Sequence, residues 1–335
     1  EGARCDWRAF WARRFRRLYP PYLAAILFTL LVALVLFPDY GLLWVAYQSG
    51  AVSPARDVLT HLLMVHNLFW NYATGLGNSP FWTLGLEEQL YALYAVLLLL
   101  RSRLPAGRTF AVTAAVTLLW YAAWVVLQHG LGRPWVCWHT WPFSYWLVWG
   151  LGALAAEAHT GALTLPRWCH RPGVGLALTG AGLLLEPPLP HMLYVDSGLA
   201  ALLGPGHWLG RATAVYFPLH LPSVYLVSLG CFVLLNRWLR AEAEGRFGGR
   251  VVASLARVGY MSYSLYLTHL PLLALCVVAL GPLGLPVNAL ATLVRYALLV
   301  PLCLAGAWAF FQLVERHFLN RPARAAPAPE LRRAA

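Results

Sequence analysis

Residues 212–236 read ATAVYFPLHLPSVYLVSLGCFVLLN, a run of 25 residues without aspartate, glutamate, arginine or lysine. A bilayer core about 30 Å thick is crossed by a helix of about 20 apolar residues. The run therefore predicts a membrane-spanning helix. Four further uncharged runs of 19 to 23 residues predict spans in the same way, and they are 20–38, 109–128, 134–156 and 296–314.

Three more stretches complete a predicted set of about eight spans, arranged as an all-α polytopic membrane helix bundle. One carries the acidic pair Glu87 and Glu88, and another is short and rich in glycine. The third ends at a Gly-Pro turn, after which the run 296–314 extends back to about residue 287. Two shorter apolar pieces stay open between re-entrant and interfacial helices. The three spans are 80–100, 173–186 and 257–280, and the open pieces are 57–70 and 192–206.

The composition excludes several classes of protein. Of 335 residues, 60% are hydrophobic and 11% are charged, against about 25% charged in a typical soluble domain. So few charges cannot cover a soluble globule, which excludes an ordinary cytosolic enzyme, a disordered chain and a nucleic-acid-binding module. The six cysteines are scattered without disulfide or zinc spacing and no HExxH motif occurs, so we expect no metal site.

The arginines sort to one side of the predicted membrane. All 25 basic residues are arginine, and with eight spans and a cytoplasmic N-terminus 21 of them fall in cytoplasmic segments. Positive residues concentrate on the cytoplasmic side of membrane proteins. We therefore expect a multi-pass protein of the cell membrane with both termini cytoplasmic. It divides into an arginine-rich cytoplasmic segment, 1–19, a transmembrane domain, 20–318, and a disordered basic cytoplasmic tail, 319–335.

A cluster of arginines precedes the first span. Arg14 and Arg17 are three residues apart, so they share one helical face, where two guanidinium groups can hold a phosphate bidentately. The alternative is a membrane anchor, in which the arginines reach lipid headgroups. Both interpretations remain open at this point.

A second candidate site lies in the predicted span 80–100, which contains Trp82 and the acidic pair Glu87 and Glu88. A carboxylate inside a membrane is costly and is by default a functional hypothesis. Adjacent helical residues point about 100° apart, so the two carboxylates cannot both face one partner. A structural pairing with Arg295 is the alternative.

The third candidate is a polar stripe on an apolar helix. Ser262, Tyr266 and His269 follow the spacing i, i+4, i+7, which places them on one face and predicts a polar cavity. A histidine that only packs and hydrogen-bonds is the alternative. His61 and His66 are five residues apart, which is off the i, i+4 spacing of a helical metal-binding pair.

Four blocks stand in a fixed order along the chain. They are RFRRLYP at 14–20, FWTLGLEEQLY at 81–91, SYSLYLTHLP at 262–271 and QLVERHF at 312–318. Together they resemble the integral-membrane acyltransferases of type 3, which O-acylate cell-envelope sugars and some secondary metabolites. The chain departs mildly from the family pattern at Thr83, Ala95 and His317, where serine, proline and proline are usual.

The resemblance implies a ten-span fold and transfer of an acyl group, commonly acetyl, from acyl-coenzyme A to a hydroxyl of an envelope glycan or similar acceptor. Acyl-CoA is then a donor substrate, no cofactor is permanently bound, and the partners are this donor, a carbohydrate or other hydroxyl acceptor and the bilayer, without nucleic acid. The resemblance implies Glu87 and His269 as catalytic residues, Arg14 and Arg17 as residues that bind acyl-CoA, and Trp82, Ser262 and Tyr266 as substrate-binding residues.

One departure concerns the start of the chain. In the family the proposed catalytic histidine lies in the first of ten spans, ahead of the RxxR block, and here only 13 residues precede Arg14. We therefore expect that this chain lacks two spans and that histidine. A transporter or flippase for a glycan or lipid-linked substrate, or an inactive fragment, is the alternative, although no internal repeat favours a transporter.

Overall fold

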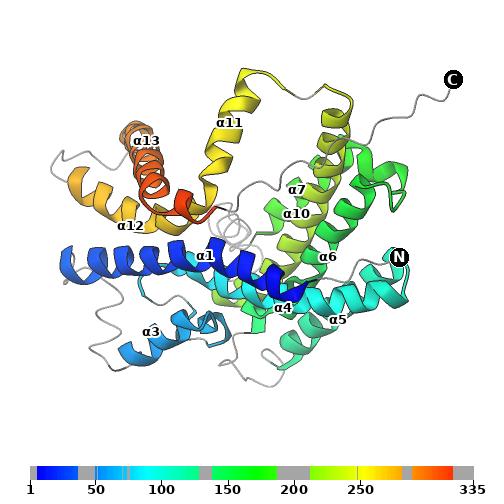
Figure 1. Ribbon diagram of the computed structural model, residues 1–335, viewed down its shortest axis with the longest axis horizontal. Helices are drawn as coiled ribbons and strands as arrows, with labels where there is room; N and C mark the ends of the chain where they lie inside the picture. The colour runs from blue at the N-terminus through cyan, green and yellow to red at the C-terminus, as the bar shows by residue number, and fades with distance from the viewer. Residues whose placement is uncertain are drawn as a thin grey trace, which may run out of the picture. The chain divides into compact units, whose positions relative to one another are not determined.

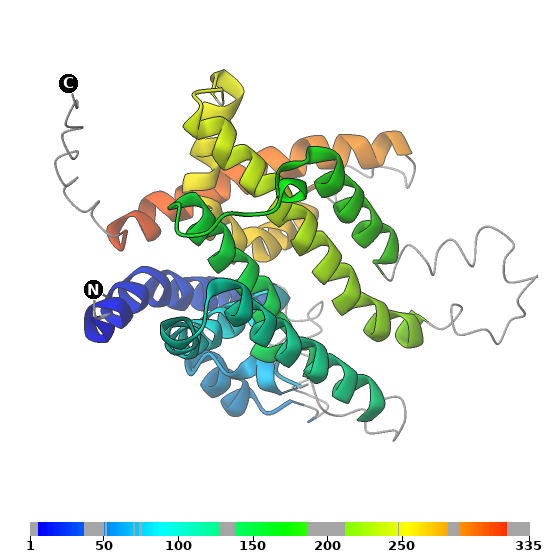
Figure 2. The same ribbon diagram turned by 90° about the vertical axis from the view of Figure 1, so that its right-hand side faces the viewer.

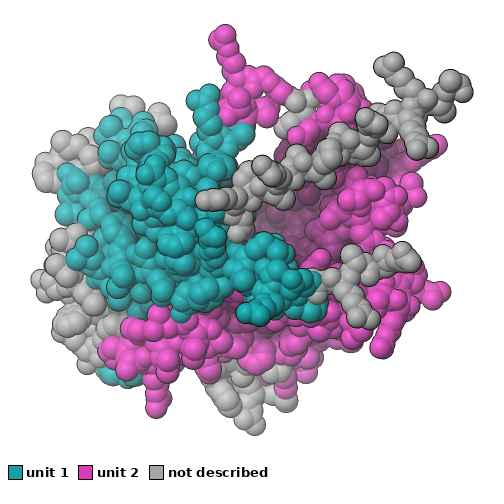
Figure 3. Space-filling view, viewed as in Figure 1, with its two compact units in different colours: residues 1–53, 75–80, 255–335 teal, residues 54–74, 81–254 magenta. Residues whose placement is uncertain are grey.

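The computed structural model describes residues 6–36, 50, 52–69, 71–73, 76–127, 138–186, 212–246, 248–280 and 289–319. Within these ranges the regular structure is helical and contains no strand, which confirms the all-α prediction (Figure 1). The chain forms two compact units, coloured separately in Figure 3. Unit 1 comprises 1–53, 75–80 and 255–335, and unit 2 comprises 54–74 and 81–254.

Unit 1 is built from helices at the two ends of the chain. The first helix begins where the Asp6 side chain accepts the Ala9 N–H at 3.0 Å, a hydrogen bond that caps its N-terminus. It runs without a break through Pro20 and Pro21, so the predicted boundary at residue 20 lies inside a helix. The elements are α1 (Trp7–Leu30), the π-helical turn η1 (Leu31–Leu36), α12 (Ser262–Leu280), α13 (Ala289–Leu313) and the 3-10 turn η9 (Glu315–His317).

Unit 2 holds the central part of the chain. Three of its helices, α3, α6 and α7, begin at proline, a residue that suits the first helical position because the N–H that it lacks would have no partner there. The elements are α3 (Pro54–Leu62), η2 (His66–Leu68), α4 (Trp82–Arg103), α5 (Ala106–Val125), η5 (Trp138–Thr140), α6 (Pro142–His159), η6 (Arg167–His170), α7 (Pro172–Leu185) and α10 (Ala212–Ala243). Helix α11 (Arg250–Tyr260) and the turn η3 (Ser79–Phe81) are each divided between the units.

Four helical segments among the described residues are long and apolar enough to cross a membrane. They agree with the predicted spans 80–100, 109–128, 212–236 and 296–314. The other predicted spans are also helical, as α1 with η1, α6, α7 and α12. The predicted total of about eight crossings stays a prediction. Of the two open pieces, 57–70 contains α3 and η2, and 192–206 lies outside the described residues. The four segments are Ser79–Arg103, Ala106–Val125, Leu219–Ala243 and Tyr296–His317.

Helices α7 and α10 lie side by side and approach each other closely (Figure 2). A Cβ on Gly182 would lie 2.8 Å from the Val227 nitrogen, and one on Gly230 would lie 2.7 Å from the Gly175 oxygen. Small residues allow such backbone approach, which in membranes takes the place of a hydrophobic driving force. Packing against α10 thus explains Gly175 and Gly182 of the short stretch 173–186.

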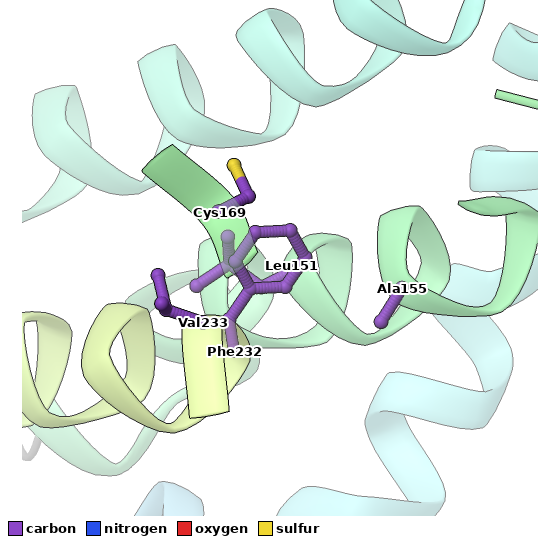
Figure 4. Packing of buried hydrophobic residues seen from close by; sticks show 5 residues of the cluster. All are labelled: Leu151, Ala155, Cys169, Phe232 and Val233. Carbon is purple, nitrogen blue, oxygen red and sulfur yellow. The ribbon is translucent and has the colours of Figure 1, made fainter. Parts of the chain in front are cut away.

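The core of unit 2 includes a cluster in which α6, η6 and α10 meet (Figure 4). Its members are apolar and at most 6% exposed, so it fixes the three elements relative to one another. They are Leu151, Ala155, Cys169, Phe232 and Val233.

Candidate active site

The three polar residues predicted to share a face of α12 line one cavity of about 510 Å³ in unit 1. The cavity lies between α12 and α13, and its lining residues recur at helical spacing on both helices, so one face of each helix forms a wall. The structure therefore brings Ser262, Tyr266 and His269 to one space. The rest of the wall consists of Leu265 and Leu273 from α12 and Tyr296, Leu299, Val300, Cys303 and Leu304 from α13.

The hydrogen bonds of His269 define which ring nitrogen carries the proton. Its Nδ1 lies 2.8 Å from the carbonyl oxygen of Tyr266 and 3.2 Å from that of Leu265. A carbonyl oxygen only accepts hydrogen bonds, so Nδ1 is the donor and carries the proton. In the neutral ring Nε2 then holds the lone pair. His269 consequently offers a basic nitrogen and is part of the cavity wall.

The part of α12 that lines the cavity is held by three hydrogen bonds to other segments of unit 1. The partners of these bonds lie on α1 and in residues 78–80, so the bonds fix the orientation of α12 about its own axis. They run from Tyr263 OH to the Leu18 oxygen at 2.9 Å, from Tyr266 OH to the Pro80 oxygen at 2.7 Å and from Asn78 Nδ2 to the Leu267 oxygen at 2.9 Å.

Glu315 is a buried carboxylate that the sequence did not single out as a site residue. Only 1% of it is exposed, and it accepts hydrogen bonds from the backbone N–H of Ser264 at 2.9 Å and from the Ser264 hydroxyl. Ser264 lies in the first turn of α12, so the carboxylate caps this helix and meets the positive end of its dipole. The two residues are 51 apart in the chain, so no local spacing reveals the pair.

The predicted donor-binding arginines both lie on α1, in the same unit as the cavity. The guanidinium of Arg14 lies 5.6 Å from the ring centroid of Phe10, within the range of a cation–π interaction. Arg17 is exposed, and its charge interacts with the carboxylate of Glu315. This placement is compatible with anion binding and with membrane anchoring.

Trp82 and Glu87 lie on α4, in unit 2. The half-buried carboxylate of Glu87 accepts a hydrogen bond from the hydroxyl of Tyr91 at 2.5 Å. The Trp82 ring packs against Tyr145 with a centroid distance of 5.8 Å. The alternative pairing of the acidic residues with Arg295 involves a side chain outside the described ones.

A separate polar network covers the face of α4 around Gly85. Asn67 and Gln89 exchange two hydrogen bonds of 3.1 and 2.8 Å. A Cβ on Gly85 would lie 2.7 Å from the Asn67 side-chain oxygen, so this face requires glycine. Glu87 projects about 200° away from Gly85 on the helix. Helix α4 therefore carries two distinct polar faces, and Glu87 belongs to the one with Tyr91.

Next to this network lies a buried pair of histidines that helical spacing did not predict. His61 and His66 stack with a centroid distance of 3.8 Å, and both are fully buried with Asp57. His61 Nδ1 donates to the backbone carbonyl oxygen of Asp57 at 2.8 Å. Burial, and then the neighbouring His61, lower the pKa of His66 to about 3. Among the described residues no group of three His, Cys, Asp or Glu is suited to a metal ion.

The described residues thus include four helical segments apolar enough for a bilayer, as in a helical membrane protein, and a cavity that His269 lines. The model of the family described as an acyltransferase domain, acyltransferase type 3, matches residues 3–312. The chain belongs to this family of membrane acyltransferases, which confirms the resemblance of the four sequence blocks. No curated protein and no solved structure is significantly similar to this chain.

Proposed function

We propose that this protein transfers an acyl group from acyl-coenzyme A to a hydroxyl of an envelope glycan or similar acceptor. Membership of the acyltransferase family supports the reaction class. The observation that carries the proposed mechanism is His269, whose proton sits on Nδ1 and whose basic Nε2 belongs to a residue of the cavity wall. The donor implied by the sequence resemblance is acyl-CoA, commonly acetyl-CoA.

In this mechanism the acceptor oxygen attacks the thioester carbonyl carbon while His269 Nε2 takes the hydroxyl proton. The new C–O bond forms, and the C–S bond then breaks. The sulfur leaves as the coenzyme A thiolate and receives the proton back from the imidazolium, so the free thiol is the second product. Ser262 and Tyr266 are proposed to contact the substrate because they line the same cavity.

The remaining site residues have proposed roles that rest on their own surroundings. Arg14 and Arg17 are proposed to bind the phosphates of the donor, because guanidinium groups suit bidentate phosphate binding. Glu87 is proposed as a second catalytic group, since a carboxylate within an apolar span is energetically costly and marks a functional site by default. Trp82, on the same helix, is proposed as a substrate contact. The hydrogen bond from the Tyr91 hydroxyl holds the Glu87 carboxyl group in place on α4.

The test compares His269→Asn and Glu87→Gln with two matched controls, Glu88→Gln and His159→Asn, in acyl transfer from radiolabelled acetyl-CoA to envelope glycan. Asparagine keeps a donor for the helix carbonyls but removes the basic nitrogen. We expect both site variants to lose at least 100-fold in rate, the lower end of general-base contributions, and both controls to stay near wild type. Wild-type rates in His269→Asn, with normal accumulation in the membrane, would overturn the mechanism.

We also propose that both termini are cytoplasmic, as the arginine distribution suggests. Single cysteines at positions 103 and 133, introduced by Arg103→Cys and Arg133→Cys in a cysteine-free background, should react with an impermeant maleimide from opposite sides of the membrane. Equal accessibility of both cysteines from outside intact cells would refute this topology.

A further inference from the structure

The cavity between α12 and α13 has walls that suit only part of the proposed substrates. None of its ten lining residues is an aspartate, glutamate, arginine or lysine, and the polar ones on α12 are the three already assigned to the site. The phosphates of coenzyme A need cationic partners, and a sugar needs many hydrogen bonds that leucine and valine walls cannot make. An uncharged, apolar acyl chain is the substrate portion that this lining can bury.

The size of the cavity indicates how long that chain is. One water-sized group occupies about 30 Å³, so the three heavy atoms of an acetyl group fill roughly 90 Å³. The cavity measures about 510 Å³, more than five times as much. Along α12 its lining extends from Ser262 to Leu273, which is about 16 Å at 1.5 Å per residue. An acetyl group would leave most of this space empty.

The polar residues of the lining lie toward one end of α12. Ser262, Tyr266 and His269 lie in its N-terminal part together with Leu265, and the lining ends at the apolar Leu273, about one helical turn beyond His269. A chain that lies along the helix can therefore hold its carbonyl beside His269 and its methyl end beside leucine and valine side chains. This is the order in which a thioester-linked acyl chain presents its atoms.

We propose that this cavity binds the acyl chain of the donor thioester, and that the chain is longer than acetyl. The proposal rests on the proposed function and replaces the acetyl group implied by the sequence resemblance with a longer acyl group. A bilayer lipid tail offers the same chemistry. The thioester is favoured because a groove that only faces lipid gains nothing from a histidine and a serine, whose polar groups are costly in hydrocarbon.

The test measures binding separately from turnover. The full chain in detergent micelles is labelled with decanoyl-CoA that carries a diazirine at its chain end, and the cross-linked peptides are mapped. We expect labels within α12 and α13, displaced by octanoyl-CoA at concentrations at least tenfold lower than by acetyl-CoA, since each buried methylene contributes up to about fourfold. Phosphatidylethanolamine and free octanoate should displace the probe poorly.

A cavity-filling variant and its control complete the test. Val300→Trp, and the milder Val300→Phe, should remove most of the preference for octanoyl-CoA, because residue 300 lines the cavity. Leu302→Trp should leave the preference unchanged, because Leu302 is similarly exposed on α13 but is outside the lining.

The outcomes separate this inference from the proposed function. Equal displacement by acetyl- and octanoyl-CoA, or displacement by phospholipid as efficient as by thioester, overturns the acyl-chain assignment even if acyl transfer is observed. Chain-length-dependent labelling that Val300→Trp abolishes supports the assignment even if no transfer to a glycan is found, a result that would instead refute the proposed reaction.

Discussion

Removal of the buried carboxylate of Glu315 should destabilise unit 1 through one specific partner, Ser264. In Glu315→Ala the backbone N–H and the hydroxyl of Ser264, a residue that is fully buried, both lose their acceptor. Each unsatisfied buried group costs about 1–3 kcal/mol, and the lost interaction with the helix dipole costs about 0.3–1 kcal/mol. We therefore expect the free energy of unfolding to fall by about 4 kcal/mol.

The partner variant separates the two hydrogen bonds. Ser264→Ala removes only the hydroxyl donor, and the loss of a hydrogen bond to a charged group should cost about 1.5–3 kcal/mol. If the hydroxyl stabilises the fold through Glu315, Ser264→Ala should lower the free energy of unfolding much less in a chain that already carries Glu315→Ala than in the wild-type chain. The expected coupling free energy is then about 1.5 kcal/mol or more. Glu315→Gln keeps an acceptor oxygen, so its free energy of unfolding should lie between those of the wild type and Glu315→Ala.

Unfolding in mixed micelles of rising dodecyl sulfate content, followed by the fluorescence of the 16 tryptophans, measures these differences. Glu244→Ala is the matched control because it removes an exposed carboxylate whose surface ion pairs, with Arg240 and with Arg246, should each contribute less than about 1 kcal/mol. Additive effects of Ser264→Ala and Glu315→Ala, within about 0.5 kcal/mol, would refute the reasoning.

Three further predictions concern the donor site, a buried histidine and a helix contact. Arg14→Ala and Arg17→Ala should each weaken acyl-CoA binding by about 1.5–3 kcal/mol in calorimetric titration, and lysine should restore only part of the loss; unchanged affinity in both would leave only the anchor interpretation. Because the pKa of His66 falls from 6.5 to about 3 on folding, the unfolded chain binds a proton that the native chain does not. The free energy of unfolding should therefore drop by about 2 kcal/mol from pH 7 to pH 5 in the wild type and by less in His66→Phe. The same pH dependence in both proteins would contradict a lowered pKa of His66. Gly230→Ala should cost about 1–3 kcal/mol because its Cβ would meet the backbone of α7 at 2.7 Å, while Gly180→Ala, with open space around its Cβ, should cost nothing in the same unfolding assay.

Periodicity and charge predicted those features that depend on a single helix. Uncharged runs identified the apolar helices, because a bilayer imposes their length and composition residue by residue. The spacing of Ser262, Tyr266 and His269 placed them on one face, and the structure lines one cavity with all three. A helix fixes the relative direction of side chains within it, so such predictions need no knowledge of other helices.

The stacking of His61 and His66 depends on where a helix stops. Their separation of five residues is off the spacing of a helical metal-binding pair, and spacing alone gave no reason to expect contact between their rings. Helix α3 ends at Leu62, and Met64 adopts a positive φ of 54°, so the backbone changes direction between the two histidines. Their rings stack as a result.

The sequence by itself determined the helical membrane class, the family and the faces on which the polar residues of α12 and the arginines of α1 lie. Only the tertiary structure decided that α13 forms the opposite wall of the cavity, that Glu315 caps α12 through Ser264, and that α7 packs two of its glycines against α10. The physical reason is that these contacts join residues far apart in the chain. They depend on how whole helix surfaces fit together, which no local spacing encodes.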